Sequence, residues 1–330
     1  MSELAFQSAL VTGAGGFIGG HLATELVRRG VRVRGLLRYT SRGDRGTLDW
    51  FEDGAGREVE AQFGDLRDVE SVQRAVDGVE VVFHLGAQIA IPYSYVNPRD
   101  YLKTNVEGTL NVAQAALAAG TRRVVHTSTS EVYGSAQTVP ITEDHPLVGQ
   151  SPYSASKIGA DTLVESFHRS FALPSVTVRP FNTYGPHQST RAVIPTIITQ
   201  GLAGGTLRLG SLHPRRDLTF VSDTVAGFIA AAAADGVEGA TMQLGTGHDV
   251  SVGEIVELVG ELLGRELAVE LDEQRVRPAL SEVERLVSSP ARARELTGWE
   301  PRVDLRDGLA RTVAWLEHSG ERLARDGYAV

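Results

Sequence analysis

Short apolar runs alternate with amphipathic stretches along the first half of the chain. The apolar runs, each short enough to be a buried strand, cover residues 9–11, 31–37, 59–63, 79–83, 123–127 and 176–179. Helical periodicity between these runs covers residues 17–29, 69–76, 98–119 and 152–171. Strands that alternate with helices favour a parallel sheet covered on both faces, with right-handed crossovers. The pattern therefore predicts an α/β fold.

The alternation ends after Pro180. Residues 182–217 are rich in glycine, proline and threonine and contain one helical stretch at 194–202. Residues 220–234 predict a further helix, and residues 241–244 predict a short strand that returns to the sheet. Helical and polar segments follow, and the chain ends in a charged tail.

The length of 330 residues suggests about two domains. We find no internal repeat and no low-complexity linker, so we expect the second, smaller domain to be interleaved with the first. Residues 1–181 and about 218–247 are expected to form the larger domain. Residues from about 182 to 217 and 248–330 are expected to form the smaller one.

Composition and charge argue against metal sites, nucleic-acid binding and membrane association. The absence of cysteine excludes disulfides and thiolate zinc sites, and the nine histidines lack metal-ligand spacing, so we expect no metal site. A net charge of −9 without a basic stretch argues against nucleic acid and anionic membranes as partners. No apolar run reaches the roughly 18 residues of a membrane span. The first predicted strand begins close to Met1, which leaves no room for a signal peptide, so we expect a cytoplasmic protein.

A glycine-rich turn follows the first predicted strand. Gly13, Gly16 and Gly19 have the GxxGxxG spacing. The first glycine allows a tight turn, the second lets the backbone approach a pyrophosphate, and the third permits close packing of helix on strand. Exposed N–H groups and the helix dipole would then hold the anion. Because the turn joins the first strand to the first helix, a dinucleotide site is favoured over a plain packing turn.

The residues after the second and third predicted strands help to distinguish NAD from NADP as the bound dinucleotide. The second strand of such folds usually ends near an acidic residue that binds the ribose 2′-hydroxyl of NAD. Here Arg38 stands near that end, with hydroxyl groups close by, which suits a 2′-phosphate and favours NADP slightly over NAD. A solvated surface arginine is the alternative. Asp65 lies where a carboxylate could meet the adenine amino group, although an ordinary loop aspartate fits as well.

Tyr153 and Lys157 open the predicted helix at 152–171 and share one helix face, because residues four apart in a helix are neighbours. A lysine beside a positive nicotinamide ring would lower the tyrosine pKa, so that the phenol could act as a general base near neutral pH. The chain has two lysines, Lys103 and Lys157, and one of them occupies this position. An exposed helical pair is the alternative interpretation.

Thr129, Ser130 and Glu131 follow the fifth predicted strand. Open α/β sheets bind ligands at the carboxyl ends of their strands, so these side chains are expected to face the nicotinamide. A capping cluster of hydroxyl residues with a solvated glutamate is the alternative.

Together these segments resemble extended short-chain dehydrogenase/reductases that act on nucleotide sugars, over essentially the whole chain. The resemblance is carried by residues 13–19, 84–88, 129–131, 153–157, 181–186, 216–217, 277–278 and 281–283. It is strongest to 4,6-dehydratases of the GDP-mannose type and of legionaminic acid pathways. Residues 34–38 and the Thr-Ser-Glu triplet fit these better than the dTDP-glucose type, which carries Thr-Asp-Glu. The implied fold is a Rossmann doubly wound parallel sheet with a smaller, interleaved C-terminal substrate domain.

The resemblance implies a complete reaction on a GDP- or UDP-linked hexose. Tyr153 would take the C4 hydroxyl proton while C4 gives hydride to a tightly bound NAD or NADP, with Thr129 hydrogen-bonded to the same oxygen. Glu131 would take the C5 proton, water would leave C6, and the hydride would return to C6. Ser130 replaces the aspartate that protonates the leaving hydroxyl in dTDP-glucose dehydratases. Either Glu131 is both base and acid, or a water relays the proton through Ser130.

The resemblance also implies two sets of binding residues. The cofactor set is Gly13, Gly16, Phe17, Ile18, Gly19, Arg38, Asp65, Leu66, Leu85, Ala87, Tyr153, Lys157 and Pro180. The substrate set is Ser94, Thr129, Asn182, Arg216, Arg277 and Glu282, of which the arginines suit a diphosphate. The long helices at 98–119 and 152–171 match an intersubunit four-helix bundle, which implies a homodimer.

Two sister activities remain as alternatives, because sugar 4-epimerases and UDP-glucuronate decarboxylases begin with the same oxidation at C4. Glu131 discriminates, since an epimerase needs no base at C5, whereas a decarboxylase needs a pocket for a C6 carboxylate. A non-enzymatic dinucleotide sensor would have no use for Tyr153 and Lys157.

Overall fold

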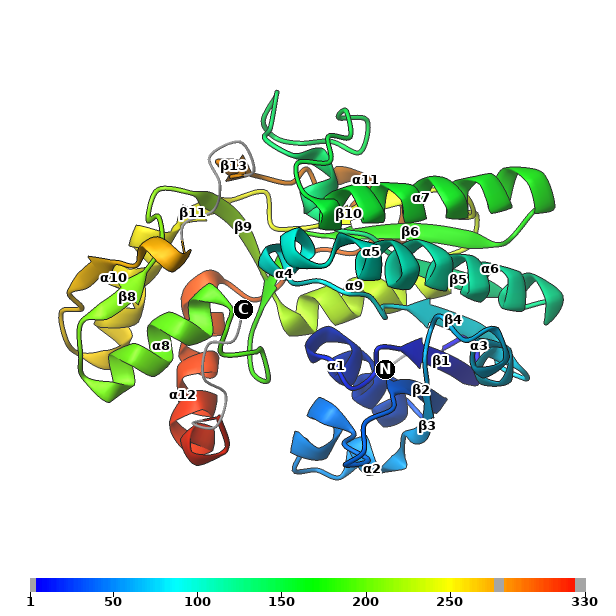
Figure 1. Cartoon of the computed structure of the whole chain (residues 1–330), viewed down its shortest axis with the longest axis horizontal. Coiled ribbons are helices and arrows are strands. Elements are labelled where there is room, and N and C mark those ends of the chain that lie inside the picture. The colour runs from blue at the N-terminus through cyan, green and yellow to red at the C-terminus, as the bar shows by residue number, and fades with distance from the viewer. Residues whose placement is uncertain (1–3, 276–281, 324–330) are drawn as a thin grey trace.

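A seven-stranded parallel sheet forms the larger part of the computed structural model, which describes residues 4–275 and 282–323 (Figure 1). Its strand order is β10-β6-β5-β4-β1-β2-β3, and every neighbouring pair is parallel. The strands are β1 (Ser8–Thr12), β2 (Arg32–Arg38), β3 (Glu60–Gly64), β4 (Val81–His84), β5 (Arg123–Thr127), β6 (Ser175–Pro180) and β10 (Thr241–Leu244). The order reverses between β1 and β4, which is where doubly wound sheets bind ligands.

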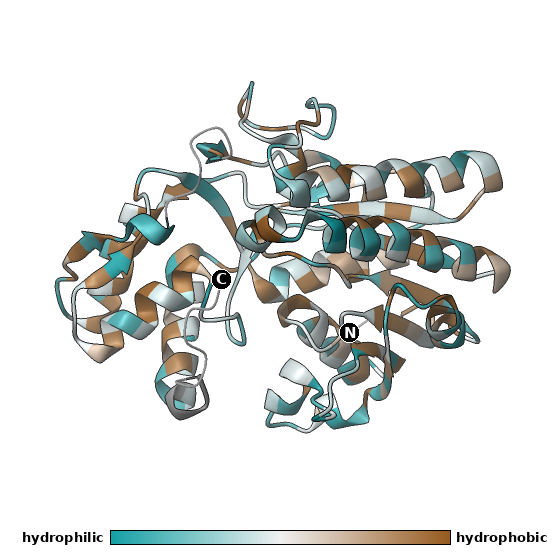
Figure 2. Cartoon of the chain, viewed as in Figure 1, coloured by the Kyte–Doolittle hydropathy of each residue, from teal (hydrophilic) through white to brown (hydrophobic). Residues whose placement is uncertain are grey.

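Helices cover both faces of this sheet because successive strand residues point to opposite sides. Leu10 of β1 packs in a cluster with residues of α3, α6 and α7, whereas Ala9 and Val11 pack in another with residues of α1 and α9. Figure 2 shows apolar residues along the strands and mixed faces on the surrounding helices. These helices are α1 (Phe17–Arg28), α3 (Val69–Val76), α6 (Gly108–Ala118), α7 (Pro152–Phe171) and α9 (Val221–Ala233). The predicted parallel sheet with two covered faces is confirmed.

A second lobe lies beyond β9 and carries smaller sheets. Strand β9 pairs with β7, β11 and β13, and β8 pairs with β12. The strands are β7 (Asn182–Tyr184), β8 (Leu207–Leu209), β9 (Arg215–Phe220), β11 (Asp249–Ser251), β12 (Val269–Leu271) and β13 (Arg285–Leu286). The helices of this lobe are α8 (Val193–Ala203), α10 (Val252–Leu263) and α12 (Leu305–Leu323). Helix α11 (Ala291–Thr297) packs instead beside β10 and α9 of the large sheet. Figure 1 shows α8, α10 and β8 grouped at one end of the molecule.

The predicted helix at 98–119 is helical along nearly its whole length but changes type within it. It consists of α5 (Pro98–Tyr101), the π-helical turn η2 (Leu102–Glu107) and α6. The short elements α2 (Ala55–Glu58), α4 (Ile91–Val96), η1 (Gly46–Trp50), η3 (Ser130–Tyr133) and η4 (Glu273–Arg275) complete the fold. The predicted return of residues 241–244 to the sheet is confirmed, since β10 is the edge strand beside β6. None of the described helices has the length and apolar character that crossing a membrane demands.

Candidate active site

The glycine turn is packed too tightly for larger residues. Gly13 has a φ of +72°, and a Cβ atom there would come within 2.9 Å of the Gly86 Cα atom. A Cβ atom on Gly19 would come within 2.2 Å of the Gly13 carbonyl oxygen. Gly16 is the N-cap of α1, and no side chain caps that end. The first N–H groups of α1, which begins with Phe17 and Ile18, are therefore left for an anion.

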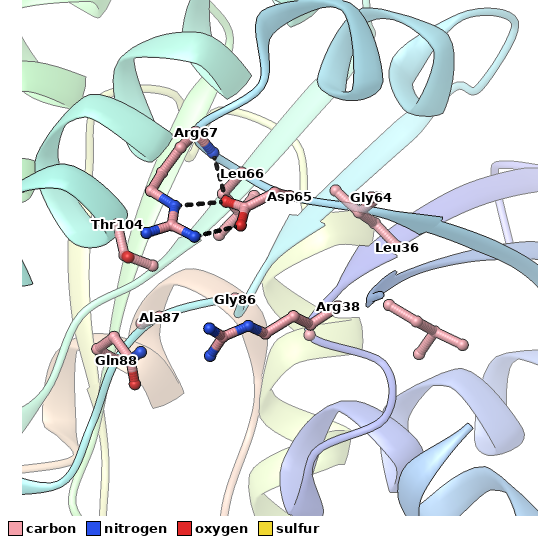
Figure 3. A pocket seen from close by; sticks show the side chains of 12 residues that line it. Leu36, Arg38, Gly64, Asp65, Leu66, Arg67, Gly86, Ala87, Gln88 and Thr104 are labelled. Carbon is pink, nitrogen blue, oxygen red and sulfur yellow. Dashed lines mark hydrogen bonds and ion pairs between the residues drawn. The ribbon is translucent and has the colours of Figure 1, made fainter. Parts of the chain in front are cut away.

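A pocket runs from this turn along the ends of β2, β3 and β4. Its lining includes five of the predicted cofactor residues, namely Gly13, Arg38, Asp65, Leu66 and Ala87. Figure 3 shows the Arg38 side chain extended across the pocket toward Ala87, apart from the pair formed by Asp65 and Arg67. Leu85 adjoins Gly13, because a Cβ atom on Gly13 would lie 3.2 Å from the Leu85 carbonyl carbon.

Asp65 is already engaged by a neighbour. Its two carboxylate oxygens accept hydrogen bonds from Arg67 Nε at 2.9 Å and from Arg67 Nη2 at 2.6 Å, and these bonds lower the pKa of Asp65. Arg67 also reaches Asp100 in α5 at 3.0 Å. Arg38 forms no hydrogen bond or ion pair with the described residues, so its guanidinium group stays available to a ligand. Arg67 was not predicted, since nothing in the sequence separates it from other surface arginines.

These observations fit a nicotinamide dinucleotide. The close approach of Gly13 to Gly86 leaves a cradle that a Cβ atom would fill, and the uncapped N-terminus of α1 faces it. Pro180, the last residue of β6, is buried at the carboxyl edge of the sheet beside Leu244.

The predicted catalytic side chains come from two neighbouring elements. Thr129 caps η3, which begins directly after β5 and carries Ser130 and Glu131. Tyr153 and Lys157 lie in the first turns of α7, which begins at a Ser151 capping box. The Tyr153 phenol is hydrogen-bonded to the Thr129 side chain, and the Glu131 carboxylate is near enough to act on it.

The tyrosine and the lysine are almost fully buried, and burial acts oppositely on their charged forms. Burial raises the pKa of Tyr153 well above its usual value, while the bond to Thr129 lowers it. Burial lowers the pKa of Lys157 to about 8, against the opposing effect of the Asp161 carboxylate. Lys157 Nζ donates a hydrogen bond to the Thr127 carbonyl oxygen at 2.6 Å. The ammonium is thus held one helical turn from Tyr153 on the same face of α7, where a positive charge would favour the phenolate.

A buried hydrogen-bond chain ties the π-helical turn to this site, and the sequence did not predict it. Asn105, within η2, donates to Ser156 Oγ of α7 at 2.9 Å and exchanges two hydrogen bonds with the Gln88 backbone. Its carbonyl oxygen accepts from Thr109 Oγ1 at 2.6 Å, and Thr109 in turn contacts His84 at 3.0 Å. The sequence signal for this chain of hydrogen bonds is Asn105 itself, a polar residue inside a predicted helix.

The predicted substrate residues are partly brought together. Arg216 of β9 forms an ion pair with Glu282 at 3.4 Å, and both side chains are mostly buried. Asn182 lies exposed at the start of β7. Ser94 is fully buried, and its hydroxyl donates to the Ile91 carbonyl oxygen at 2.6 Å.

Arg277 lies outside the described residues. Across residues 4–275 and 282–319, no cluster of three or more histidine, aspartate or glutamate side chains is arranged to hold a metal ion.

Comparisons with known proteins agree on the family. Residues 10–312 match the family described as GDP-mannose 4,6-dehydratase. A UDP-glucose 4-epimerase from Mycolicibacterium smegmatis is 34% identical, over 94% of this chain and 99% of that protein. A dTDP-glucose 4,6-dehydratase from Xanthomonas campestris pv. campestris is also 34% identical, over 93% and 92%. The crystal structure of DesIV, a dTDP-glucose 4,6-dehydratase from Streptomyces venezuelae with NAD and TYD bound, matches with a TM-score of 0.85 and 31% identity, over 96% of this chain and 99% of that one.

Proposed function

Since the chain belongs to the GDP-mannose 4,6-dehydratase family of extended short-chain dehydrogenase/reductases, we propose that it dehydrates a nucleotide-linked hexose to the 4-keto-6-deoxyhexose. One observation carries the choice of reaction. The Tyr153 phenol is bonded to Thr129, and the buried Lys157 follows it by one turn of α7. Glu131 stands in the same 3-10 turn as Ser130. A general base for the C4 hydroxyl and a second base for C5 are thereby available together.

NAD or NADP, held at the glycine turn of Gly13, Gly16 and Gly19, would supply a hydride acceptor for C4 and the hydride donor for C6. Tyr153 removes the proton of the C4 hydroxyl, and Thr129 orients that oxygen. The resulting ketone acidifies C5, and Glu131 removes the C5 proton as the C6 hydroxyl departs. Two protons are therefore taken from the sugar, and two are given back, one to the departing hydroxyl and one to C5.

With serine at position 130, the departing C6 hydroxyl can receive its proton by two routes. The Ser130 side chain is almost fully buried and cannot itself supply a proton at neutral pH. Either Glu131 returns the proton it has just taken from C5, or a water relays it through the Ser130 hydroxyl. A carboxylic acid is the stronger acid of the two, which supports Glu131 in both roles.

NADP is the proposed cofactor, with NAD as the alternative. The cationic Arg38 lines the pocket at the end of β2 and has no hydrogen-bonding partner among the described residues, and guanidinium groups bind phosphate strongly. Gly13, Asp65, Leu66 and Ala87 line the same pocket, and Gly16, Phe17, Ile18 and Gly19 lie at the N-terminus of α1, which supports their proposed part in binding the cofactor. NAD is the cofactor in the structure of DesIV.

A GDP- or UDP-linked hexose, with or without an N-acetyl group, is the proposed substrate. Arg216, Arg277 and Asn182 are proposed to bind its diphosphate, Glu282 a ribose hydroxyl and Ser94 the hexose. The ion pair between Arg216 and Glu282 supports a shared role at one end of the substrate. We further propose that residues from about 182 to 217 and from 248 form the substrate domain, to which β9 contributes at its boundary.

We also propose a cytoplasmic homodimer built on the face that carries η2, α6 and α7. Leu102, Leu117 and Phe171 are exposed apolar side chains of these elements, which supports their burial against a second copy. The absence of cysteine in the chain fits a reducing compartment.

Epimerisation at C4 is the second candidate, because an epimerase stands among the relatives at the same identity as a dehydratase. The products separate the two activities. Purified protein is mixed with GDP-, UDP-, dTDP- and CDP-hexoses, and the products are weighed by mass spectrometry. A product lighter by one water is expected, with deuterium from solvent at C5. A product of unchanged mass and inverted C4 would overturn the proposal in favour of an epimerase.

A further inference from the structure

We propose that Asp161 is a positioning residue for the catalytic lysine, which it orients through the two residues that flank Thr127. This inference rests on the role proposed above for Lys157 and goes beyond it. Asp161 lies one helical turn after Lys157 in α7, on the same face, and is almost fully buried. It touches neither the glycine turn nor the Tyr153 phenol in the hydrogen bonds of the described residues.

Asp161 collects donors from two adjacent strands. Its Oδ1 atom accepts from His126 Nε2 at 3.0 Å, and its Oδ2 atom accepts from Ser128 Oγ at 2.7 Å. The Oδ2 atom also accepts from Arg179 Nη2 of β6 at 3.1 Å. The carboxylate is therefore satisfied as an anion, and its pKa lies below the usual value because these donors and charges outweigh burial.

The first two donors flank the residue that receives the lysine. His126 and Ser128 stand on either side of Thr127 at the end of β5, and both send their side chains to the same carboxylate. Two anchors on either side of Thr127 restrict rotation of its peptide group. The Thr127 carbonyl oxygen is the acceptor of the Lys157 ammonium at 2.6 Å. Asp161 thus fixes the direction of the carbonyl group that holds Lys157.

The surrounding charges give the carboxylate a second effect on the lysine. Asp161 raises the pKa of Lys157 against the lowering caused by burial, which keeps the ammonium protonated near neutral pH. From β4 and β5, His84 and His126 also face this site, and burial lowers the pKa of both, so they carry no charge there. Arg179, from β6, is a cation whose charge Asp161 offsets.

Other side chains complete this environment. Tyr133 accepts from Arg179 Nη1 at 3.0 Å and from Gln243 Nε2 at 2.7 Å, so the arginine has a neutral partner besides Asp161. Two carboxylates, Glu131 and Asp161, act on Tyr153, and both raise the pKa of its phenol. Loss of the Asp161 charge would therefore leave Lys157 buried among neutral groups and one unpaired cation.

The two lysines of the chain make a direct test practical. Protein labelled with ¹³Cε- and ¹⁵Nζ-lysine gives two side-chain signals, of which exposed Lys103 serves as the internal reference. Asp161→Asn is expected to lower the measured pKa of Lys157 by about one unit. The alkaline limb of the kcat profile should move to lower pH by the same amount, because the tyrosine needs a charged lysine. The KM for the sugar should change little.

Asp223→Asn is the matched control. Asp223 is equally buried in α9, where it accepts the backbone N–H groups of Arg302 and Val303 at 2.8 Å each. This variant should lose stability without moving the pKa of Lys157. A folded Asp161→Asn protein whose Lys157 titrates as in the wild type would overturn the proposal.

Ser128→Ala keeps the charge and removes one anchor. It should lower kcat about tenfold without shifting the pH profile, since one hydrogen bond to a charged group is lost. If Asp161→Asn fails to fold, an unchanged kcat in Ser128→Ala refutes the positioning role. The lysine titration needs no substrate. A protein that dehydrates no sugar would therefore refute the proposed function, while the titration would still test the effect of Asp161 on Lys157.

Discussion

Acidification should destabilise this protein through two stacked histidines. His21 of α1 and His187, which follows β7, stack with their ring centroids 4.9 Å apart. His21 Nε2 donates to the Pro186 carbonyl oxygen at 2.9 Å, and Nδ1 of His187 is buried without a partner among the described residues. Burial lowers the pKa of His21 to about 4 and that of His187 to about 3. Both rings are therefore neutral in the folded state at pH 5 and above.

The sign of the effect follows from the difference between the folded and unfolded pKa values. Above pH 6.5, the unfolded value, both states hold neutral imidazoles and stability does not depend on these residues. Below it, the unfolded chain takes up protons that the folded chain cannot. At pH 5 each histidine then lowers the free energy of unfolding by about 2 kcal/mol, or about 4 kcal/mol for the pair. Domains of ordinary stability have about 5–15 kcal/mol in total.

Urea unfolding at pH 8, 6 and 5 measures this loss. His84 and His126 are buried with lowered pKa values and act in the same direction, whereas Glu143, whose pKa is raised by burial, acts in the opposite one. A fall of about 4 kcal/mol is therefore expected between pH 8 and 5. His21→Gln should reduce that fall by about 2 kcal/mol, because one protonation is lost. His318→Gln, at an exposed position, should leave it unchanged. Equal free energies of unfolding at pH 8 and 5 would refute the reasoning.

Three substitutions test the cofactor and catalytic residues. Tyr153→Phe should keep cofactor affinity and lower kcat by about a hundredfold or more, since it removes a general base, and kcat within tenfold of wild type would contradict that role. Arg38→Asp should shift the ratio of dissociation constants from NADP toward NAD, and purification of the wild type with NAD alone would contradict the preference. Gly13→Ala should abolish cofactor binding in a calorimetric titration, because its Cβ atom would meet Gly86 Cα at 2.9 Å, whereas wild-type affinity would contradict the cradle.

The large sheet could be predicted from the sequence because most of its strands carry short apolar stretches and its turns carry strong local signals. Residues 9–11 and 81–83 are apolar enough to be recognised without their partners, and Ser151 before Pro152 marks the start of α7. The second lobe was harder. Strands β8, β12 and β13 have two or three residues each, so they exist through long-range pairing and show no periodicity of their own.

The same distinction applies to the site. Tyr153 and Lys157 are four residues apart, so the sequence places them on one face. The hydrogen bonds to Asp161 join β5, β6 and α7, and only the folded chain brings Asp161 to His126 and Arg179. A histidine or an arginine inside an apolar strand was the sequence signal for that network. The π-helical form of η2 left no such signal, since its composition is ordinary for an α-helix.

Glu131→Gln tests the central claim, that this site dehydrates by removing a proton from C5. Glutamine is nearly isosteric with glutamate and has no basicity, so the reaction should stop after oxidation at C4. On addition of substrate, the variant is expected to accumulate reduced nicotinamide absorbance and a 4-keto sugar that retains its C6 hydroxyl. Deuterium from solvent should fail to enter C5, whereas the wild type incorporates it. Full dehydration by Glu131→Gln, with deuterium at C5, would contradict the account.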